Sequence, residues 1–177
     1  MSGGRLIVAF GPNEVAALVR GTVAMLKAEL AALPEPLLRW HPASGEWCVN
    51  EVLGHLIEAD RRGFSGRICA ILSMPDSPLA TWDQDAMARE RRDCERDTRA
   101  LLSELAALRR DGAALVEGLR RADLERGGQH PKVGYLRVGE IMQEWVHHDR
   151  NHVKQILGNV QAYAWPAMGN AQRFSAD

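Results

Sequence analysis

Three long stretches of the chain carry apolar residues at intervals of three and four, which is the period of an amphipathic helix. The first follows Gly11-Pro12-Asn13 and ends at Pro34, with seam positions Val15, Leu18, Val19, Thr22, Val23, Leu26, Leu30 and Leu33. The second ends before Pro75, with Val49, Val52, Leu53, Leu56, Phe64, Ile68, Ile71 and Leu72. The third begins at Asp85 and passes through Gly112, with Leu101, Leu105, Leu108, Leu115 and Leu119. Each stretch predicts one helix with one buried face.

A fourth helix is predicted over residues 140–156, which contain no Gly or Pro. Its apolar seam runs from Ile141 and Trp145 to His148, His152 and Gln155, so two imidazoles occupy positions where leucine is usual. Residues four apart lie about 40° apart around a helix and roughly 6 Å apart along it. Both rings can therefore reach one metal ion at the zinc–nitrogen distance of about 2.0–2.1 Å.

His55 is the candidate third ligand, because it lies between Val52 and Leu56 at the inner edge of the second helix. The alternative is a set of core histidines that are only hydrogen-bonded. Two unpaired imidazoles on an apolar seam would each leave a polar nitrogen to satisfy, and this favours metal. The other histidines are expected on the surface or in loops: His41, His130 and His147.

Four long helices without an alternating strand pattern predict an all-α fold, a four-helix bundle with long loops between the helices. A chain of 177 residues with 46% hydrophobic content fits one domain over residues 1–177. Residues 1–11 and 158–177 are expected to form peripheral tails. The core of such a bundle is a common place for side chains of facing helices to bind a metal.

Charge and cysteine content narrow the class of partner. The net charge is −1, with basic and acidic residues interspersed, which argues against a nucleic-acid-binding or anionic-membrane surface. A small molecule or another protein is the expected partner. Three cysteines, an odd number without a paired spacing, argue against a disulfide framework, and the apolar run of residues 6–10 is too short for a signal or membrane segment. We therefore expect a cytoplasmic protein with reduced, structural thiols.

Five short motifs follow one another along the chain. They are Gly45-Glu46-Trp47, Val52-Leu53-Gly54-His55-Leu56, Trp82-Asp83-Gln84-Asp85, Gly134-Tyr135-Leu136 and His148-Asp149-Arg150-Asn151-His152-Val153-Lys154-Gln155-Ile156. In order and spacing they resemble the DinB-like (DinB/YfiT-like) superfamily, from about Trp40 to Leu157. The resemblance implies a four-helix bundle, often a homodimer, in which a histidine of the second helix and the paired histidines of the fourth bind a divalent metal such as zinc or nickel.

On this chain the implied ligands are His55, His148 and His152, the same three residues that the helical pattern selects. Two positions depart from the superfamily pattern, because Cys48 and Arg137 stand where a Ser or Thr is usual. Both departures weaken helix caps and leave the metal ligands intact.

Three neutral imidazoles leave the charge of a divalent ion uncompensated and at least one coordination position free, as in catalytic zinc sites. There the ion lowers the pKa of a bound water to about 7, or holds a thiolate, and polarises a carbonyl. Relatives implied by the resemblance include metal-dependent hydrolases and transferases that use a low-molecular-weight thiol. The chain is therefore predicted to be a hydrolase or thiol transferase acting on a small-molecule electrophile. The alternatives are a metal- or ligand-binding protein without turnover and a purely structural bundle.

Several polar and aromatic residues lie at positions from which they could support this site. Glu51 and Glu144 each precede a predicted ligand by one turn, and Gln155 follows His152 by one turn. Asp149 needs a partner, an imidazole N–H or an arginine. Four loop residues could border the metal or simply fill the core: Trp47, Trp82, Asp83 and Tyr135.

Overall fold

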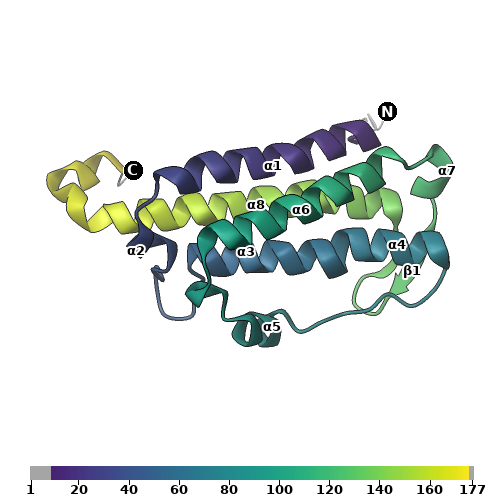
Figure 1. The fold of residues 1–177 in the computed structure, drawn as a ribbon, viewed down its shortest axis with the longest axis horizontal. Coiled ribbons are helices and arrows are strands. Elements are labelled where there is room, and N and C mark those ends of the chain that lie inside the picture. Colours follow the sequence, from purple (N-terminus) through teal and green to yellow (C-terminus); the bar gives the residue numbers. More distant parts are fainter. Residues whose placement is uncertain (1–8, 176–177) are drawn as a thin grey trace, which may run out of the picture.

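The computed structural model describes residues 9–175 and is built around four long helical rods that lie side by side (Figure 1). The rods are α1 (Pro12–Ala32), the continuous run α3 (Val49–Glu58), η1 (Ala59–Phe64) and α4 (Ser65–Ser73), then α6 (Thr98–Glu117) and α8 (Val138–Ala164). Short helices connect them: α2 (Glu35–Leu38), α5 (Gln84–Arg91), η2 (Asp93–Glu95) and α7 (Arg121–Leu124). The predicted four-helix bundle is confirmed.

The rods run in two directions. α1 and α8 run one way along the bundle, whereas α3–α4 and α6 run the other way (Figure 1). α1 packs against α6 and α8, and α3 packs against the same two helices from the opposite corner. Because α3–α4 and α6 are parallel, the connection between them must return along the whole bundle, and α5 lies on this return path.

The C-terminal segment is helical and is not a simple tail. Residues 158–164, expected in a peripheral tail, extend α8 by two further turns, and η3 (Trp165–Ser175) follows. Residues 6–8 of the N-terminal apolar run lie outside the described residues. No helix within residues 9–175 combines the length and apolar character needed to cross a membrane.

The second rod contains a wide π-helical turn that periodicity did not predict. Residues 59–64 form this turn, η1, between two α-helical segments. A Cβ atom at Gly66 would lie 2.1 Å from the carbonyl oxygen of Arg61, so only glycine fits where the rod becomes α-helical again. The wide turn directs the ring of Phe64 onto Trp145, with the ring centroids 5.1 Å apart. Such turns are frequent at functional sites.

The predicted third helix is wrong in two respects. It does not continue from Asp85, because Arg92 adopts a left-handed conformation with φ 49° and ends α5. α6 then starts afresh at its N-cap Asp97, whose carboxylate accepts a hydrogen bond from the Ala100 N–H at 2.8 Å. Its buried face also passes through Arg109, where the leucine pattern favoured Leu108, which is only half-buried.

A small hairpin occupies what the sequence suggested was a loop. β1 (Gly127–His130) pairs antiparallel with β2 (Gly134–Arg137). Strands of four residues are too short to show a convincing alternation. His130, expected on the surface or in a loop, instead ends β1 and is 8% exposed, and its Nε2 lies 3.0 Å from Nη2 of Arg67.

A layer of polar side chains divides the core into two apolar clusters. One cluster lies around Phe64, Ile68 and Trp145, and the other lies around Leu53, Leu56 and Leu105. Between them each rod contributes one buried polar residue: Thr22, Asp60, Arg109 and Asp149.

Arg109 is the centre of this layer. Its Nε donates to Asp60 Oδ2 at 2.6 Å, its Nη2 donates to Asp149 Oδ1 at 2.8 Å, and its Nη1 donates to Asp149 Oδ2. Thr22 Oγ1 donates to the same Asp149 oxygen at 2.9 Å. The layer therefore fixes the relative position of the four rods at mid-bundle, directly beside His148.

Candidate metal centre

The structure brings the three predicted histidines together on facing helices. His55 comes from α3, and His148 and His152 come from α8. One ring nitrogen of each lies within 4.8 Å of those of the other two. Nε2 of His55 and Nε2 of His148 are 3.0 Å apart. Three imidazoles that converge in this way can surround one ion, with nitrogen–metal bonds of about 2.0–2.1 Å.

The hydrogen bonds of these rings also indicate which nitrogens are free to bind a metal ion. Gln155 Oε1 lies 2.8 Å from Nδ1 of His152 and can only accept, so that nitrogen carries the proton and Nε2 keeps its lone pair. Nδ1 of His148 is buried and has no hydrogen-bond partner among the described residues. Hydrogen bonding between the rings can pair only two of the converging nitrogens, whereas an ion pairs all three. The residues present therefore fit a divalent ion.

All three imidazoles are held neutral, as metal ligands must be. Burial, with the neighbouring rings of His152 and His148, lowers the pKa of His55 to about 3. Burial, with His152, Arg109 and His147, lowers the pKa of His148 to about 3. Burial also lowers the pKa of His152. Near neutral pH the set has no charge of its own, so it would leave a bound ion cationic.

Acidification is expected to destabilise the metal-free protein. In the unfolded chain these histidines take up protons below a pKa of about 6.5, whereas His55 and His148 in the folded chain resist protonation down to about 3. The unfolded state therefore binds more protons, and stability is lost as the pH falls from about 6.5 towards 3. Urea unfolding at pH 7 and pH 5 measures the loss, and the loss should shrink in a His148→Phe variant. An equal loss in that variant would contradict the assignment.

Aromatic rings enclose the site. The Trp47 ring lies 4.9 Å from the His55 ring and is stacked 6.4 Å from the His152 ring, as centroid distances. The Phe64 ring, which the π-helical turn directs inwards, meets the His148 ring edge-on, with the ring centroids 5.1 Å apart. These apolar walls hold the imidazole rings in place and account for the burial that keeps them neutral.

A small cleft leads to His55 from the outer side of α3. α5 and the segment before it form its opposite wall, and its lining residues are Gly54, His55, Glu58, Trp82, Gln84, Met87, Ala88, Arg91 and Asp93. Of the loop residues that could border the metal or fill the core, Trp47 lies beside His55, and Trp82 lines the same cleft as His55. Asp83 instead caps α5, accepting from the Ala86 N–H at 2.9 Å, and Tyr135 donates to Asp76 at 2.7 Å.

Of the residues predicted to support the metal ligands, one contacts a candidate ligand and others do not. Gln155 contacts a candidate ligand directly. Glu51 accepts from the N–H of Cys48 at 2.8 Å and so caps α3, and Glu144 is exposed. Asp149 does find an arginine, Arg109. The sequence analysis did not identify Asp60 or Arg109, although a lone arginine four residues after Leu105 on an apolar seam was a usable signal.

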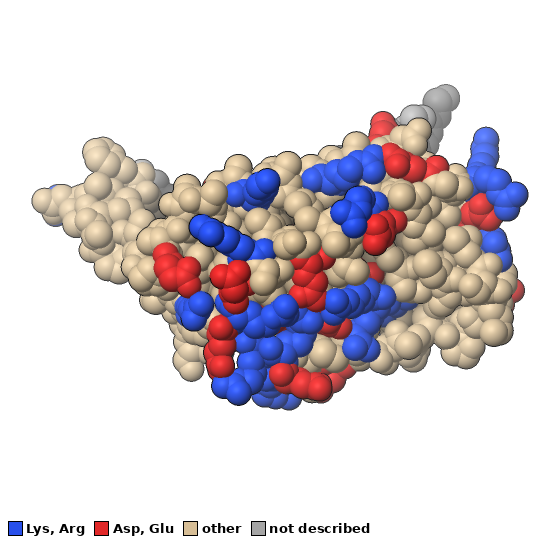
Figure 2. Space-filling model, viewed as in Figure 1, with Lys and Arg blue, Asp and Glu red and all other residues tan. Residues whose placement is uncertain are grey.

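The outer wall of the cleft is held by a dense set of ion pairs. Figure 2 shows mixed basic and acidic side chains gathered over α5 and the start of α6. Glu58, 4% exposed as a whole residue, receives hydrogen bonds from Arg61, Arg62 and Arg91 at 2.7–3.1 Å. Asp93 receives them from Arg91 and Arg96. These pairs attach the return segment to α3.

Gly54 is expected to be required for the close packing of the return segment on α3. A Cβ atom there would lie 1.8 Å from Oδ2 and 2.3 Å from Cγ of Asp93, so Gly54→Ala must displace the carboxylate that binds Arg91 and Arg96. We expect a loss of roughly 2–3 kcal/mol in the free energy of unfolding. The matched control is Gly21→Ala in α1, where nothing lies within 4 Å and helix propensity predicts a gain of about 0.5–1 kcal/mol. Chemical denaturation that ranks the two variants equally would refute this role.

Comparison with known proteins agrees with the fold and relates the chain to proteins named as metal-dependent. The sequence profile of the DinB superfamily matches residues 17–156. A protein of Oceanobacillus iheyensis named "Putative metal-dependent hydrolase" is 24% identical over 153 residues, covering 86% of each chain. A Bacillus licheniformis protein of the same name is 26% identical over 145 residues, covering 80% of each chain.

A solved structure shows the same fold. YfiT from Bacillus subtilis, described as "a probable metal-dependent hydrolase with an unusual four-helix bundle topology", superposes with a TM-score of 0.81 at 19% identity, over 92% of this chain and 93% of that one. Together with the profile match over most of the chain, the sequence and structural likeness settle the family. The chain belongs to the DinB superfamily.

Proposed function

We propose that this protein is a metal-dependent enzyme in which His55, His148 and His152 hold one divalent ion, zinc or nickel, for reaction with a small-molecule electrophile. The convergence of three neutral imidazoles, without a thiolate or carboxylate in the same group, carries this proposal. When bound to such a set, a divalent ion keeps a free coordination position and lowers the pKa of a water or thiol there.

The residues around the histidines have distinct parts in this proposal. Gln155 fixes the tautomer of His152 by accepting its Nδ1–H. Trp47 and Phe64 restrict the orientation of the rings and keep bulk water from their faces. Asp149 lies next to His148 on α8 and is bound by Arg109, so the polar layer holds this part of α8 in register with α3.

The cleft beside His55 is the proposed approach for the substrate. Trp82 and Met87 give it an apolar surface, and Arg91 lies in it, paired with Glu58 and Asp93. Its volume of about 10 Å³ admits about one water molecule, so the cleft must widen to take a small electrophile.

Hydrolysis is the favoured reaction, because the relatives at 24% and 26% identity both have the name of metal-dependent hydrolases. Transfer of a low-molecular-weight thiol as co-substrate is the second candidate, since an ion held by the same three ligands could bind a thiolate in place of water. The homodimer implied by the superfamily resemblance stays a prediction.

The test is a substrate screen of the full-length, metal-loaded protein. Amides and esters are assayed without thiol, and epoxides, haloalkanes and maleyl compounds are assayed with several cellular thiols. Turnover without thiol selects the hydrolase, and turnover only with thiol selects the transferase. His148→Ala should lower turnover by at least about 100-fold, while His147→Ala, exposed on the same helix, should leave it unchanged. Undiminished turnover in His148→Ala would reject the proposal.

A further inference from the structure

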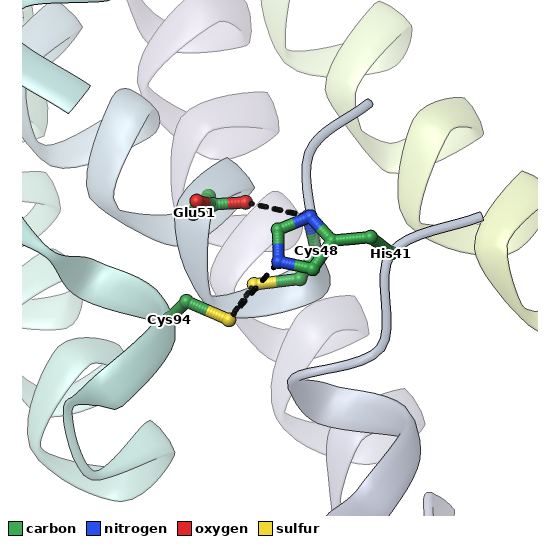
Figure 3. A group of neighbouring side chains, drawn as sticks. All are labelled: His41, Cys48, Glu51 and Cys94. Atoms are coloured by element: carbon green, nitrogen blue, oxygen red, sulfur yellow. Dashed lines mark hydrogen bonds and ion pairs between the residues drawn. The ribbon is translucent and has the colours of Figure 1, made fainter. Parts of the chain in front are cut away.

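A second group of side chains with metal-binding chemistry lies near the start of α3, apart from the three histidines. Its members are His41, Cys48, Glu51 and Cys94, and one ligand atom of each lies within 4.8 Å of the others. Figure 3 shows the four side chains converging from three segments: the connection before α3, the first turn of α3, and η2. The two cysteines are 46 positions apart, so their spacing along the chain does not predict this contact.

The two sulfur atoms are the centre of the group. Sγ of Cys48 and Sγ of Cys94 are 2.8 Å apart, and Nε2 of His41 lies 3.5 Å from Sγ of Cys94. Cys48 is completely buried, Cys94 is half-buried and His41 is exposed, so the group opens to solvent on one side only. An ion could enter from that side and remain attached to the body of the protein.

His41 and Glu51 are already oriented for binding an ion. Nδ1 of His41 lies 2.8 Å from the carbonyl oxygen of Glu46, which can only accept, so Nε2 keeps its lone pair and points towards the sulfur. The carboxylate of Glu51 is held beside the group by the N–H of Cys48 at 2.8 Å, and its Oε2 lies 3.5 Å from Nδ1 of His41, so the carboxylate contacts a different nitrogen of this ring from the one that the sulfur contacts. A backbone carbonyl that fixes the tautomer of a ligating histidine is typical of metal sites.

We propose that His41, Cys48, Glu51 and Cys94 form a second metal site, which binds Zn²⁺ or a similar borderline-soft divalent ion. Two thiolates, an imidazole and a carboxylate fill a tetrahedral ion completely, which is the arrangement of structural zinc sites. Binding exchanges two S–H protons, released to solvent, for two sulfur–metal bonds. On zinc at about 2.3 Å each, the two sulfurs would lie about 3.8 Å apart. Binding therefore requires the two sulfurs to move apart from their present 2.8 Å.

A disulfide is the competing use of the same sulfurs, and the surroundings disfavour it. A disulfide would not use the lone pair of His41 Nε2, which points towards Sγ of Cys94, whereas an ion would bind this nitrogen together with both sulfurs.

The second site would stabilise a different part of the fold from the first. It would join the α2–α3 connection to η2 at the end of the bundle where α3 and α6 begin (Figure 1). Trp47, which precedes Cys48, contacts two histidines of the first site. An ion bound here would therefore also hold the aromatic wall of the first site in position.

Cobalt substitution tests this proposal, because only a thiolate ligand gives Co²⁺ an intense near-ultraviolet charge-transfer band. The metal-free, full-length protein is reduced with a phosphine and titrated with Co²⁺ without oxygen. The expected result is a charge-transfer band that is removed by added Zn²⁺. In His148→Ala, where the three-histidine site is disabled, the band should persist and saturate at one ion per chain.

Variants of the second site complete the test. Cys94→Ser should abolish the band, and His41→Ala should weaken cobalt binding by at least about tenfold. Cys69→Ser is the matched control, because Cys69 is exposed and outside the group. Circular dichroism confirms that each variant is folded. No band in the reduced wild-type protein, or an equal band in Cys94→Ser, would overturn the proposal, as would a Cys48–Cys94 disulfide that re-forms in the presence of excess Zn²⁺.

Discussion

Replacing Arg109 with alanine is expected to lower the free energy of unfolding by about 3–5 kcal/mol, because it leaves two buried carboxylates without their cation. Asp60 and Asp149 are each 1% exposed, and Arg109 is the cation bound to both. For a chain of this size the loss corresponds to a fall in melting temperature of roughly 6–20 °C. Thermal unfolding followed by circular dichroism measures it.

The matched control is Arg110→Ala on the same helix. Its side chain is 75% exposed and, within residues 9–175, is paired only with the exposed Asp111, so the change should stay within about 0.5 kcal/mol.

A second variant removes the whole charged group, with Asp60→Leu, Arg109→Met and Asp149→Leu together. Because no charge then remains buried, this triple variant should be more stable than Arg109→Ala alone. The opposite order would show that the charges are not the source of the loss.

The sequence was sufficient for the four rods and for the three histidines. The rods are amphipathic over 20 or more residues, and a long pattern of this kind has few alternative solutions. His148 and His152 lie on one helix, so their distance follows from helix geometry alone. His55 lies on another helix, and its selection needed the expectation that the inner faces of two rods meet in a bundle.

Features that depend on contacts between distant segments could not be predicted in this way. The left-handed Arg92 divides one helical pattern into two, and no residue there is a strong breaker. The π-helical turn before Gly66 and the approach of Cys94 to Cys48 depend on how the return segment packs on α3. Spacing along the sequence contains no information about either.

Zinc added to the metal-free protein at about 100 times its dissociation constant should raise the free energy of unfolding by about 2.7 kcal/mol, since the proposed site of His55, His148 and His152 exists only in the folded chain. The melting temperature should then rise by roughly 5–11 °C. The experiment is carried out in a Cys94→Ser background, so that binding through the paired sulfurs cannot contribute.

In that background His148→Ala should abolish the stabilisation by zinc, and His147→Ala should retain it. The comparison is sharp because the two histidines are adjacent on α8, yet only His148 lies 3.0 Å from Nε2 of His55. The His147 ring is exposed and lies near Asn151, on the side of the helix away from the other rings. Equal stabilisation of the two variants would mean that zinc binds elsewhere, and the three-histidine site would then have to be abandoned as the metal centre.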